Sequence, residues 1–121
     1  MATINLNILV KSVNTSSNVL SLYGQDILTV EEPLEDTSKA SVDTVSPLTI
    51  VSNTAAKDAY VYIKNTDATN FVTLRTASGS APFASLEPGE VCFFTALASV
   101  GLELIADTAA CIVEYGYWTK T

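Results

Sequence analysis

The stretch 59–64, with the sequence Ala-Tyr-Val-Tyr-Ile-Lys, decides the fold class. Its aliphatic residues occupy every second position, and two tyrosines and a lysine occupy the positions between them. Successive side chains of an extended chain point to opposite faces, so this stretch places its aliphatic residues on one face and its polar ones on the other. The alternation predicts a β-strand with one buried face.

A hairpin is predicted directly after this strand. The polar cluster 65–70, Asn-Thr-Asp-Ala-Thr-Asn, is typical of a turn. A second alternating stretch, 71–75, leads away from that cluster. Because consecutive strands are usually neighbours in a sheet, we expect 59–64 and 71–75 to pair with each other.

Short strands separated by turn residues fill the rest of the chain. Gly24 is expected to end one of them. Pro88-Gly89 fits the centre of a type II turn, because proline fixes one φ and glycine allows the positive φ that follows. The acidic, Ser/Thr-rich stretch 31–46 predicts a long surface loop that carries an edge strand at 40–44. This stretch and the N-terminal strand are the segments expected to reach a neighbouring chain. The other strands are predicted at 4–10, 19–23, 27–30, 48–51, 83–86, 91–94, 101–106 and 110–118.

This spacing predicts one all-β domain spanning residues 1–121, built as a two-sheet antiparallel β-sandwich or a small barrel. A chain of 121 residues is long enough for one core. Because 48% of the residues are hydrophobic and only 16% are charged, two interpretations of its surface stay open. Partner chains cover part of the apolar surface, or the protein is a well-packed monomer with a Ser/Thr-rich exterior.

The charge of the chain argues against nucleic acids and membranes as partners. The formal net charge is −7, and the sequence pI is about 4.2. Phosphate binding needs clustered lysine and arginine, and anionic lipid surfaces attract the same residues. The six basic residues are instead scattered along the chain: Lys11, Lys39, Lys57, Lys64, Arg75 and Lys120.

The N-terminal sequence and the cysteines indicate a protein that stays where it is made. Residues 1–5 lack the basic region and the apolar run of a signal peptide, and no stretch is long and apolar enough to span a bilayer. In a reducing compartment Cys92 and Cys111 are expected to be two buried thiols that behave as small hydrophobic residues. A disulfide between neighbouring strands is the alternative.

The residue types needed for catalysis are missing, so we expect no enzyme, no cofactor and no metal site. The chain has no histidine, which excludes Ser-His-Asp and Cys-His catalysis and histidine-ligated zinc. Its five glycines are spread singly and form no phosphate-binding loop. Three carboxylate pairs could serve glycoside hydrolysis, but all lie in turn or loop sequence. They are Glu31 with Glu32, Glu35 with Asp36, and Glu87 with Glu90. The acidic loop could hold Ca²⁺, but it lacks the spaced pattern of a calcium loop.

Four aromatic residues are candidates for partner contact: Tyr60, Tyr62, Tyr117 and Trp118. Tyrosine and tryptophan are enriched at interfaces because they bury a large area and still satisfy a polar tip. The same residues have high strand propensity and fill cores. Both roles stay open from the sequence.

Parts of the chain resemble a known group of proteins. Residues 60–67 (Tyr-Val-Tyr-Ile-Lys-Asn-Thr-Asp) with 71–74, the stretch 86–90 (Leu-Glu-Pro-Gly-Glu), and residues 107–115 are similar to small virion proteins of tailed bacteriophages. The resemblance covers residues 58–119, and residues 1–50 take no part in it.

This resemblance implies a β-sandwich, often a jelly roll, that assembles as trimers and carries no catalytic residue. It implies a capsid cement or decoration protein, made in the host bacterial cytoplasm, that binds the major capsid protein on the outer shell and stabilises it. A tail, neck or fibre-attachment component is the first alternative. A carbohydrate- or host-surface-binding module is the second.

Overall fold

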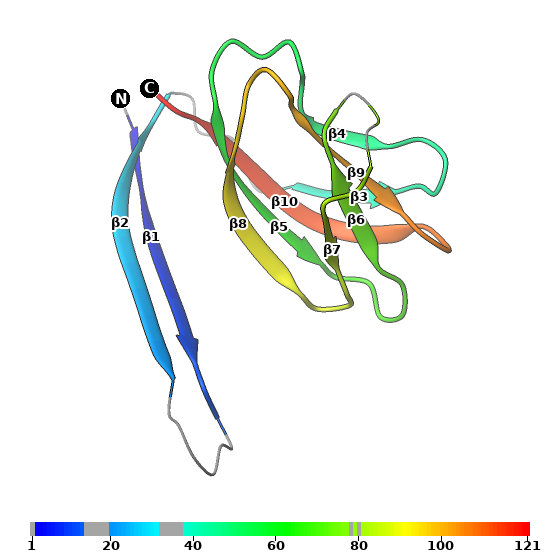
Figure 1. The fold of residues 1–121 in the computed structure, drawn as a ribbon, viewed down its shortest axis with the longest axis horizontal. Coiled ribbons are helices and arrows are strands. Elements are labelled where there is room, and N and C mark those ends of the chain that lie inside the picture. The colour runs from blue at the N-terminus through cyan, green and yellow to red at the C-terminus, as the bar shows by residue number, and fades with distance from the viewer. Residues whose placement is uncertain (1, 14–19, 32–37, 78, 80) are drawn as a thin grey trace.

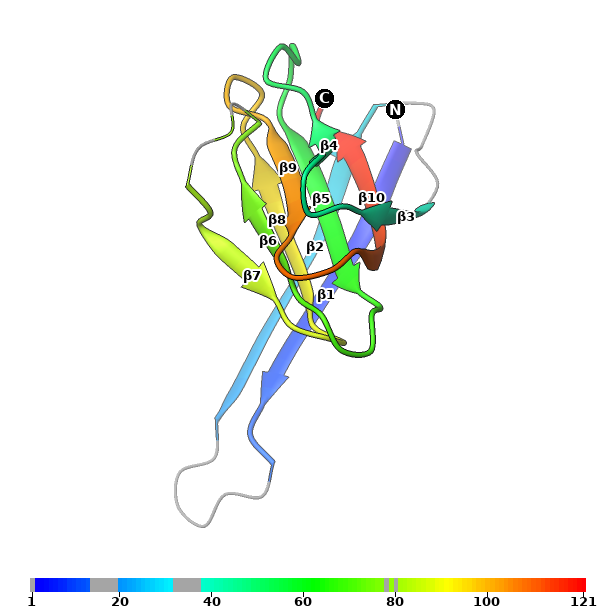
Figure 2. The same ribbon diagram turned by 90° about the vertical axis from the view of Figure 1, so that its right-hand side faces the viewer.

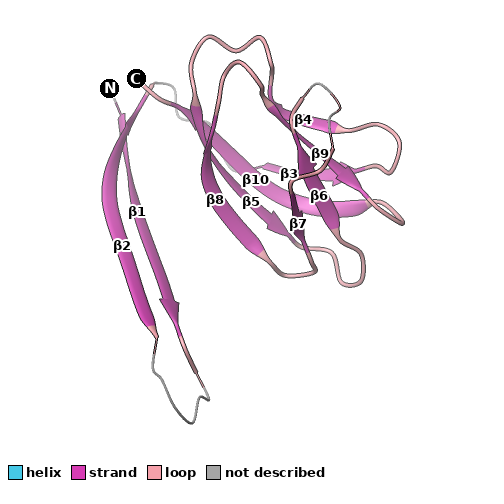
Figure 3. Ribbon diagram, in the orientation of Figure 1, coloured by secondary structure: helices cyan, strands magenta, loops and turns pink. Residues whose placement is uncertain are grey.

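The computed structural model describes residues 2–13, 20–31, 38–77, 79 and 81–121, and it shows a β-hairpin that projects beside a two-sheet sandwich (Figure 1). All regular structure in these residues is β-strand, as Figure 3 shows. The hairpin consists of β1 (Ala2–Lys11) and β2 (Ser21–Val30). The sandwich strands are β3 (Ser38–Val42), β4 (Leu48–Val51), β5 (Ala59–Asn65), β6 (Val72–Arg75), β7 (Ala84–Leu86), β8 (Val91–Ala96), β9 (Leu102–Ala106) and β10 (Cys111–Thr119).

The eight sandwich strands form two four-stranded antiparallel sheets (Figure 2). Sheet I has the order β3-β10-β5-β8, and sheet II has the order β4-β9-β6-β7. The chain changes sheet at every connection except the one from β6 to β7. Two interlocked sheets with this strand order are the arrangement of a jelly roll. The prediction of an all-β, two-sheet sandwich is therefore confirmed.

The core lies between the two sheets. Each strand contributes every second side chain to it, as the period of two requires. Sheet II supplies aliphatic residues from β6 and β9, and sheet I supplies the aliphatic positions of β5 that the alternation of 59–64 predicts. The buried core residues are Val42, Ile50, Val51, Ala59, Val61, Ile63, Val72, Leu74, Leu86, Ala96, Leu102, Leu104, Ala106, Cys111 and Val113.

The predicted hairpin between 59–64 and 71–75 is wrong. β5 pairs with β10 and β8 in sheet I, whereas β6 pairs with β9 and β7 in sheet II. The connection 66–71 carries the chain across the end of the sandwich from one sheet to the other. A polar cluster of this kind is compatible with either connection, because turn chemistry does not say which sheet the next strand joins.

The fully buried Asn65 organises this crossing. Its side-chain Nδ2 donates hydrogen bonds to the carbonyl oxygens of Asn70 (2.9 Å) and Leu86 (3.0 Å), and its Oδ1 accepts one from the amide of Asp67 (3.0 Å). Backbone N–H donors from Asn70 and Thr69 lower the pKa of the Asp67 carboxyl. The end of β5 is thereby joined to the residues that precede β6 and to the end of β7.

Other local predictions have mixed outcomes. The turn at Pro88-Gly89 is confirmed, because Gly89 has φ of 84° and the Glu90 amide donates to the Glu87 carbonyl at 3.0 Å. The edge strand predicted at 40–44 is present as β3, two residues earlier, at one edge of sheet I. Gly24 does not end a strand: β2 runs through it, with Gly24 opposite Ile8. The polar cluster 14–18, which is typical of a turn, and the acidic part of the predicted loop, at 32–37, lie outside the described residues.

We expect Asn65→Leu to lower the free energy of unfolding by about 3 kcal/mol or more, because it leaves two carbonyls and one amide without partners in a dry site. Urea denaturation followed by fluorescence measures the change. Asn53→Leu, at an exposed loop position, is the control and should stay within about 0.5 kcal/mol. Equal losses in the two variants would contradict the role given to Asn65.

We expect opposite results from two glycine substitutions. Gly101 has φ of 68°, and a Cβ there would lie 2.5 Å from the Val51 carbonyl oxygen, so Gly101→Ala should cost about 3 kcal/mol. Gly24 has no atom within 4 Å of such a Cβ, so Gly24→Ala should stabilise its strand by about 0.5 kcal/mol. Thermal unfolding of both variants measures the difference. A loss of stability in Gly24→Ala would show that this strand needs a glycine.

Candidate interaction surface

The hairpin of β1 and β2, called the arm from here on, is amphipathic. Its register runs without interruption from Ala2 opposite Val30 to Lys11 opposite Ser21. Residues directly opposite each other share a face of an antiparallel pair. One side of the arm, called the apolar face, therefore contains Ala2, Ile4, Leu6, Ile8, Val10, Leu22, Gly24, Asp26, Leu28 and Val30.

The other side of the arm is the polar face. Its members are Thr3, Asn5, Asn7, Leu9, Lys11, Ser21, Tyr23, Gln25, Ile27 and Thr29. The Tyr23 hydroxyl lies 3.1 Å from Asn7 Oδ1 on β1 and 3.0 Å from Gln25 Oε1 on its own strand, and the contact with Asn7 links the two strands on this face. A face with satisfied polar side chains is suited to contact with water.

The apolar face is covered at only one end of the arm. Near the base, Val30 is fully buried and Leu28 is 8% exposed. Farther along, Ile8, Val10 and Leu22 are 43%, 50% and 58% exposed. Figure 1 shows the reason: the arm starts beside the sandwich and extends beyond it. An apolar surface thus continues from a packed half to an uncovered half.

Backbone and side-chain contacts fix the base of the arm to the end of β10. Val30 forms a β-bridge with Lys120, and the Glu31 amide donates to the Thr119 carbonyl at 2.8 Å. The Lys57 ammonium forms an ion pair with the Glu31 carboxylate. The arm therefore extends the hydrogen-bonding of sheet I at its base only.

The outer face of sheet I is aromatic where the arm lies beside it. Tyr60 and Phe93 stack with ring centroids 6.1 Å apart, and the Lys120 ammonium lies 5.3 Å from the Tyr60 centroid. Tyr62 is opposite Phe93 in the sheet, and its hydroxyl is 3.5 Å from Glu114 Oε1. Burial, together with the Glu114 charge, raises the pKa of Tyr62. Tyr60, Tyr62 and Phe93 are each half-buried on this face.

The four predicted contact residues do not share one face. Tyr60, Tyr62 and Trp118 lie on the outer face of sheet I, where the register places Trp118 opposite Tyr60. Tyr117 lies opposite Val61 on the inner face and packs against the core. The N-terminal strand, predicted to reach a neighbouring chain, is β1 of the arm. The apolar face of the arm was not predicted, because the pairing of β1 with all of β2 is needed to see it.

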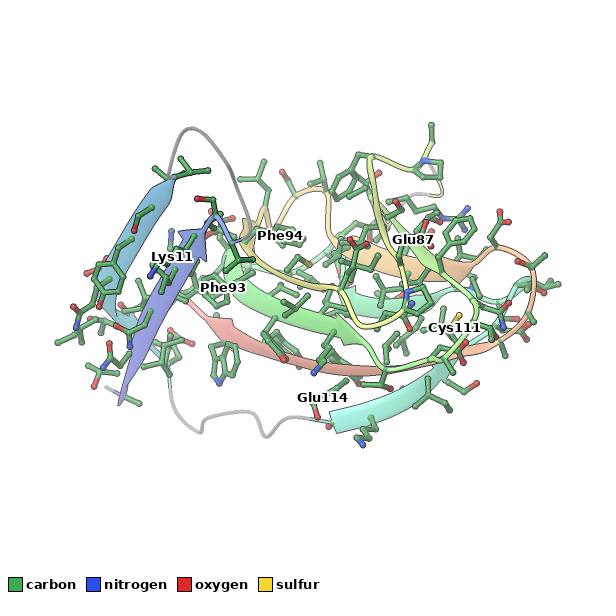
Figure 4. All side chains as sticks on the ribbon, turned by 90° about the horizontal axis from the view of Figure 1, so that it is seen from below. Lys11, Glu87, Phe93, Phe94, Cys111 and Glu114 are labelled. Carbon is green, nitrogen blue, oxygen red and sulfur yellow. The ribbon has the colours of Figure 1, made fainter. Side chains whose placement is uncertain are left out.

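A cleft of about 440 Å³ separates the arm from sheet I. Arm residues 5–9 form one wall, and Tyr62, Val91, Cys92 and Phe93 form the other. Figure 4 shows β1 beside the strand that carries Phe93. Val91 is 56% exposed at this site, so an apolar surface is open on the sandwich side as well.

Two of the candidate carboxylates have polar partners. Glu31 is paired with Lys57, and Glu90 Oε1 accepts the Glu87 amide at 2.6 Å within its turn. Glu32, Glu35 and Asp36 lie outside the described residues. Cys92 and Cys111 are free thiols on β8 and β10, which β5 separates, and burial raises the pKa of both.

The described part of the chain contains no cluster of three or more cysteine and carboxylate ligands that could hold a metal ion. It also contains no helix with the length and hydropathy needed to cross a membrane. Comparisons of the chain with protein-family models, with curated proteins and with solved structures find no match.

We expect apolar burial, and not the ion pair, to hold the arm on the sandwich. Val30→Ala should weaken this attachment by about 2 kcal/mol and speed hydrogen exchange of the β1 amides by roughly 30-fold. Glu31→Gln should change the exchange rate by less than about threefold, because the Lys57 and Glu31 side chains are 50% and 43% exposed. Hydrogen exchange with mass spectrometry measures both, and the reverse ranking would show that the ion pair dominates.

Proposed function

We propose that this chain is a non-enzymatic structural protein of a tailed-bacteriophage particle, a cement or decoration protein that binds the major capsid protein on the outer shell. The observation that carries the proposal is the arm, whose apolar face continues past the sandwich into an uncovered half. An isolated two-stranded hairpin is at best marginally stable in water. A long apolar arm is therefore suited to a protein whose working state is an assembly.

The rest of the molecule fits such a role. A jelly-roll sandwich offers a rigid support, and the carboxylates of Glu31 and Glu90 are engaged in an ion pair and in a turn. A chain without histidine lacks the most common general acid and base. The resemblance of residues 58–119 to phage virion proteins supplies the kind of particle, the capsid surface as location, the trimeric state and the bacterial cytoplasm as the place of synthesis.

A tail, neck or fibre-attachment component is the second candidate, because an arm that joins neighbouring subunits is equally suited to a ring. A carbohydrate-binding module is less well supported. Such modules present a free aromatic platform, whereas Tyr60 here lies between Phe93 and Lys120. The two structural candidates differ in copy number and in position on the particle.

Quantitative mass spectrometry of purified particles of a phage that encodes this chain separates these candidates. We expect a copy number of the same order as that of the major shell protein, and antibody labelling spread over the whole shell. A few copies per particle, with label at one vertex or on the tail, would favour the second candidate. Absence from purified particles would overturn both.

A further inference from the structure

The chain exposes more surface than a compact protein of its mass. Its accessible surface is 7204 Å² at 12.8 kDa. A compact monomer of that mass exposes about 6,300 Å², so the excess is about 900 Å². One partner in a stable protein–protein interface buries about 800 Å². The excess is thus of the size that one specific interface covers.

The arm also carries no net charge. Its two strands contain one basic residue, Lys11, and one acidic residue, Asp26. The net charge of −7 therefore lies entirely outside the arm. Two copies that approach through their sandwiches bring like charges together, whereas a contact through the arm avoids this repulsion.

The chain carries a surface that fits the apolar face of its own arm. The packed half of the arm lies along the outer face of sheet I, where Leu6 belongs to a cleft wall opposite Tyr62 and Phe93. A second copy has the same cleft, in which the exposed Val91 is open on the sandwich side. The uncovered half of the arm continues the same apolar face, so it can pack against this apolar cleft in the same way.

We propose that the distal half of the arm, around Val10 and Leu22, packs into the cleft between the arm and sheet I of a second copy. This contact buries the exposed apolar residues of the donor and Val91 of the acceptor. Each copy inserts its arm into the next copy, an arrangement called arm exchange from here on. The copies then form a closed ring, and the rotational symmetry of the ring sets the number of copies. This inference deepens the proposed function, and its role in a phage particle rests on that function. The contact itself can be tested with the purified protein alone.

Disulfide trapping tests the contact directly. Val10→Cys and Val91→Cys, each in a Cys92→Ser background that removes the free thiol of the cleft, are purified separately under reducing conditions, mixed, and oxidised, so that a Val10→Cys to Val91→Cys disulfide can form only between two molecules. We expect a reducible covalent dimer at least about tenfold more abundant than in a mixture of Lys11→Cys and Val91→Cys in the same background. Lys11 is the matched control, since it adjoins Val10 but lies on the polar face and outside the cleft wall. Equal trapping in the two mixtures, or none in either, would overturn the proposal.

A second measurement does not depend on cysteine chemistry. Val10→Ser with Leu22→Ser should raise the dissociation constant for self-association by about 100-fold, as judged by sedimentation. The matched double variant Tyr23→Ser with Ile27→Ser removes side chains of similar exposure from the polar face, away from the cleft, and should leave the dissociation constant within about threefold. Circular dichroism checks that both variants stay folded. A wild-type protein that is monomeric at high concentration, or equal weakening by both variants, would overturn the proposal.

The failure of this inference is distinguishable from failure of the proposed function. A monomeric protein that is abundant on the capsid shell would refute arm exchange and leave the cement role standing. A protein that forms arm-exchanged oligomers but is absent from phage particles would refute the cement role and leave the contact standing.

Discussion

The sandwich depends on a polar constraint at one end of its core, the buried side chain of Asn65. Its amide binds two carbonyls and one N–H on two segments, at distances of 2.9 to 3.0 Å. One segment is the connection 66–71, which leaves sheet I for β6, and the other is the end of β7 in sheet II. Aliphatic residues alone would permit several ways of laying one sheet on the other. The directional hydrogen bonds of one amide select the crossing that gives this strand order.

The sequence predicts strands well and their partners poorly, for a physical reason. Alternation of aliphatic and polar side chains is a local property, so β4 and β5 are found at or within one residue of their predicted bounds. Pairing depends on contacts between residues far apart, and the predicted pairing of β5 with β6 is wrong for that reason. The prediction that Gly24 ends a strand is wrong for another reason: glycine is tolerated within a strand wherever no side chain is needed.

The candidate surface was predictable only in part. Alternation placed Tyr60 and Tyr62 on one face of their strand, and the structure puts both on the outer face of sheet I. Tyr117 and Trp118 are adjacent and must point to opposite faces, so both could not serve the same surface. To predict the apolar face of the arm, one needs the register between β1 and β2, and neither strand's own sequence contains that register. Its uncovered half follows from the position of the arm beside the sandwich.

The strand order has a consequence for how the chain acquires its structure. In the sandwich, β3 pairs with β10, β4 with β9 and β5 with β8, so the pairs are nested and the outermost one waits for the last strand to be made. Such distant pairing folds on a scale of milliseconds to seconds, whereas a local hairpin forms in about 1–10 μs. The arm can therefore form and dissolve many times before sheet I exists. Until β10 completes sheet I, the apolar face of the arm lacks the surface against which it packs in the folded chain. Rapid synthesis of β10 therefore shortens the time in which this face can associate with other chains.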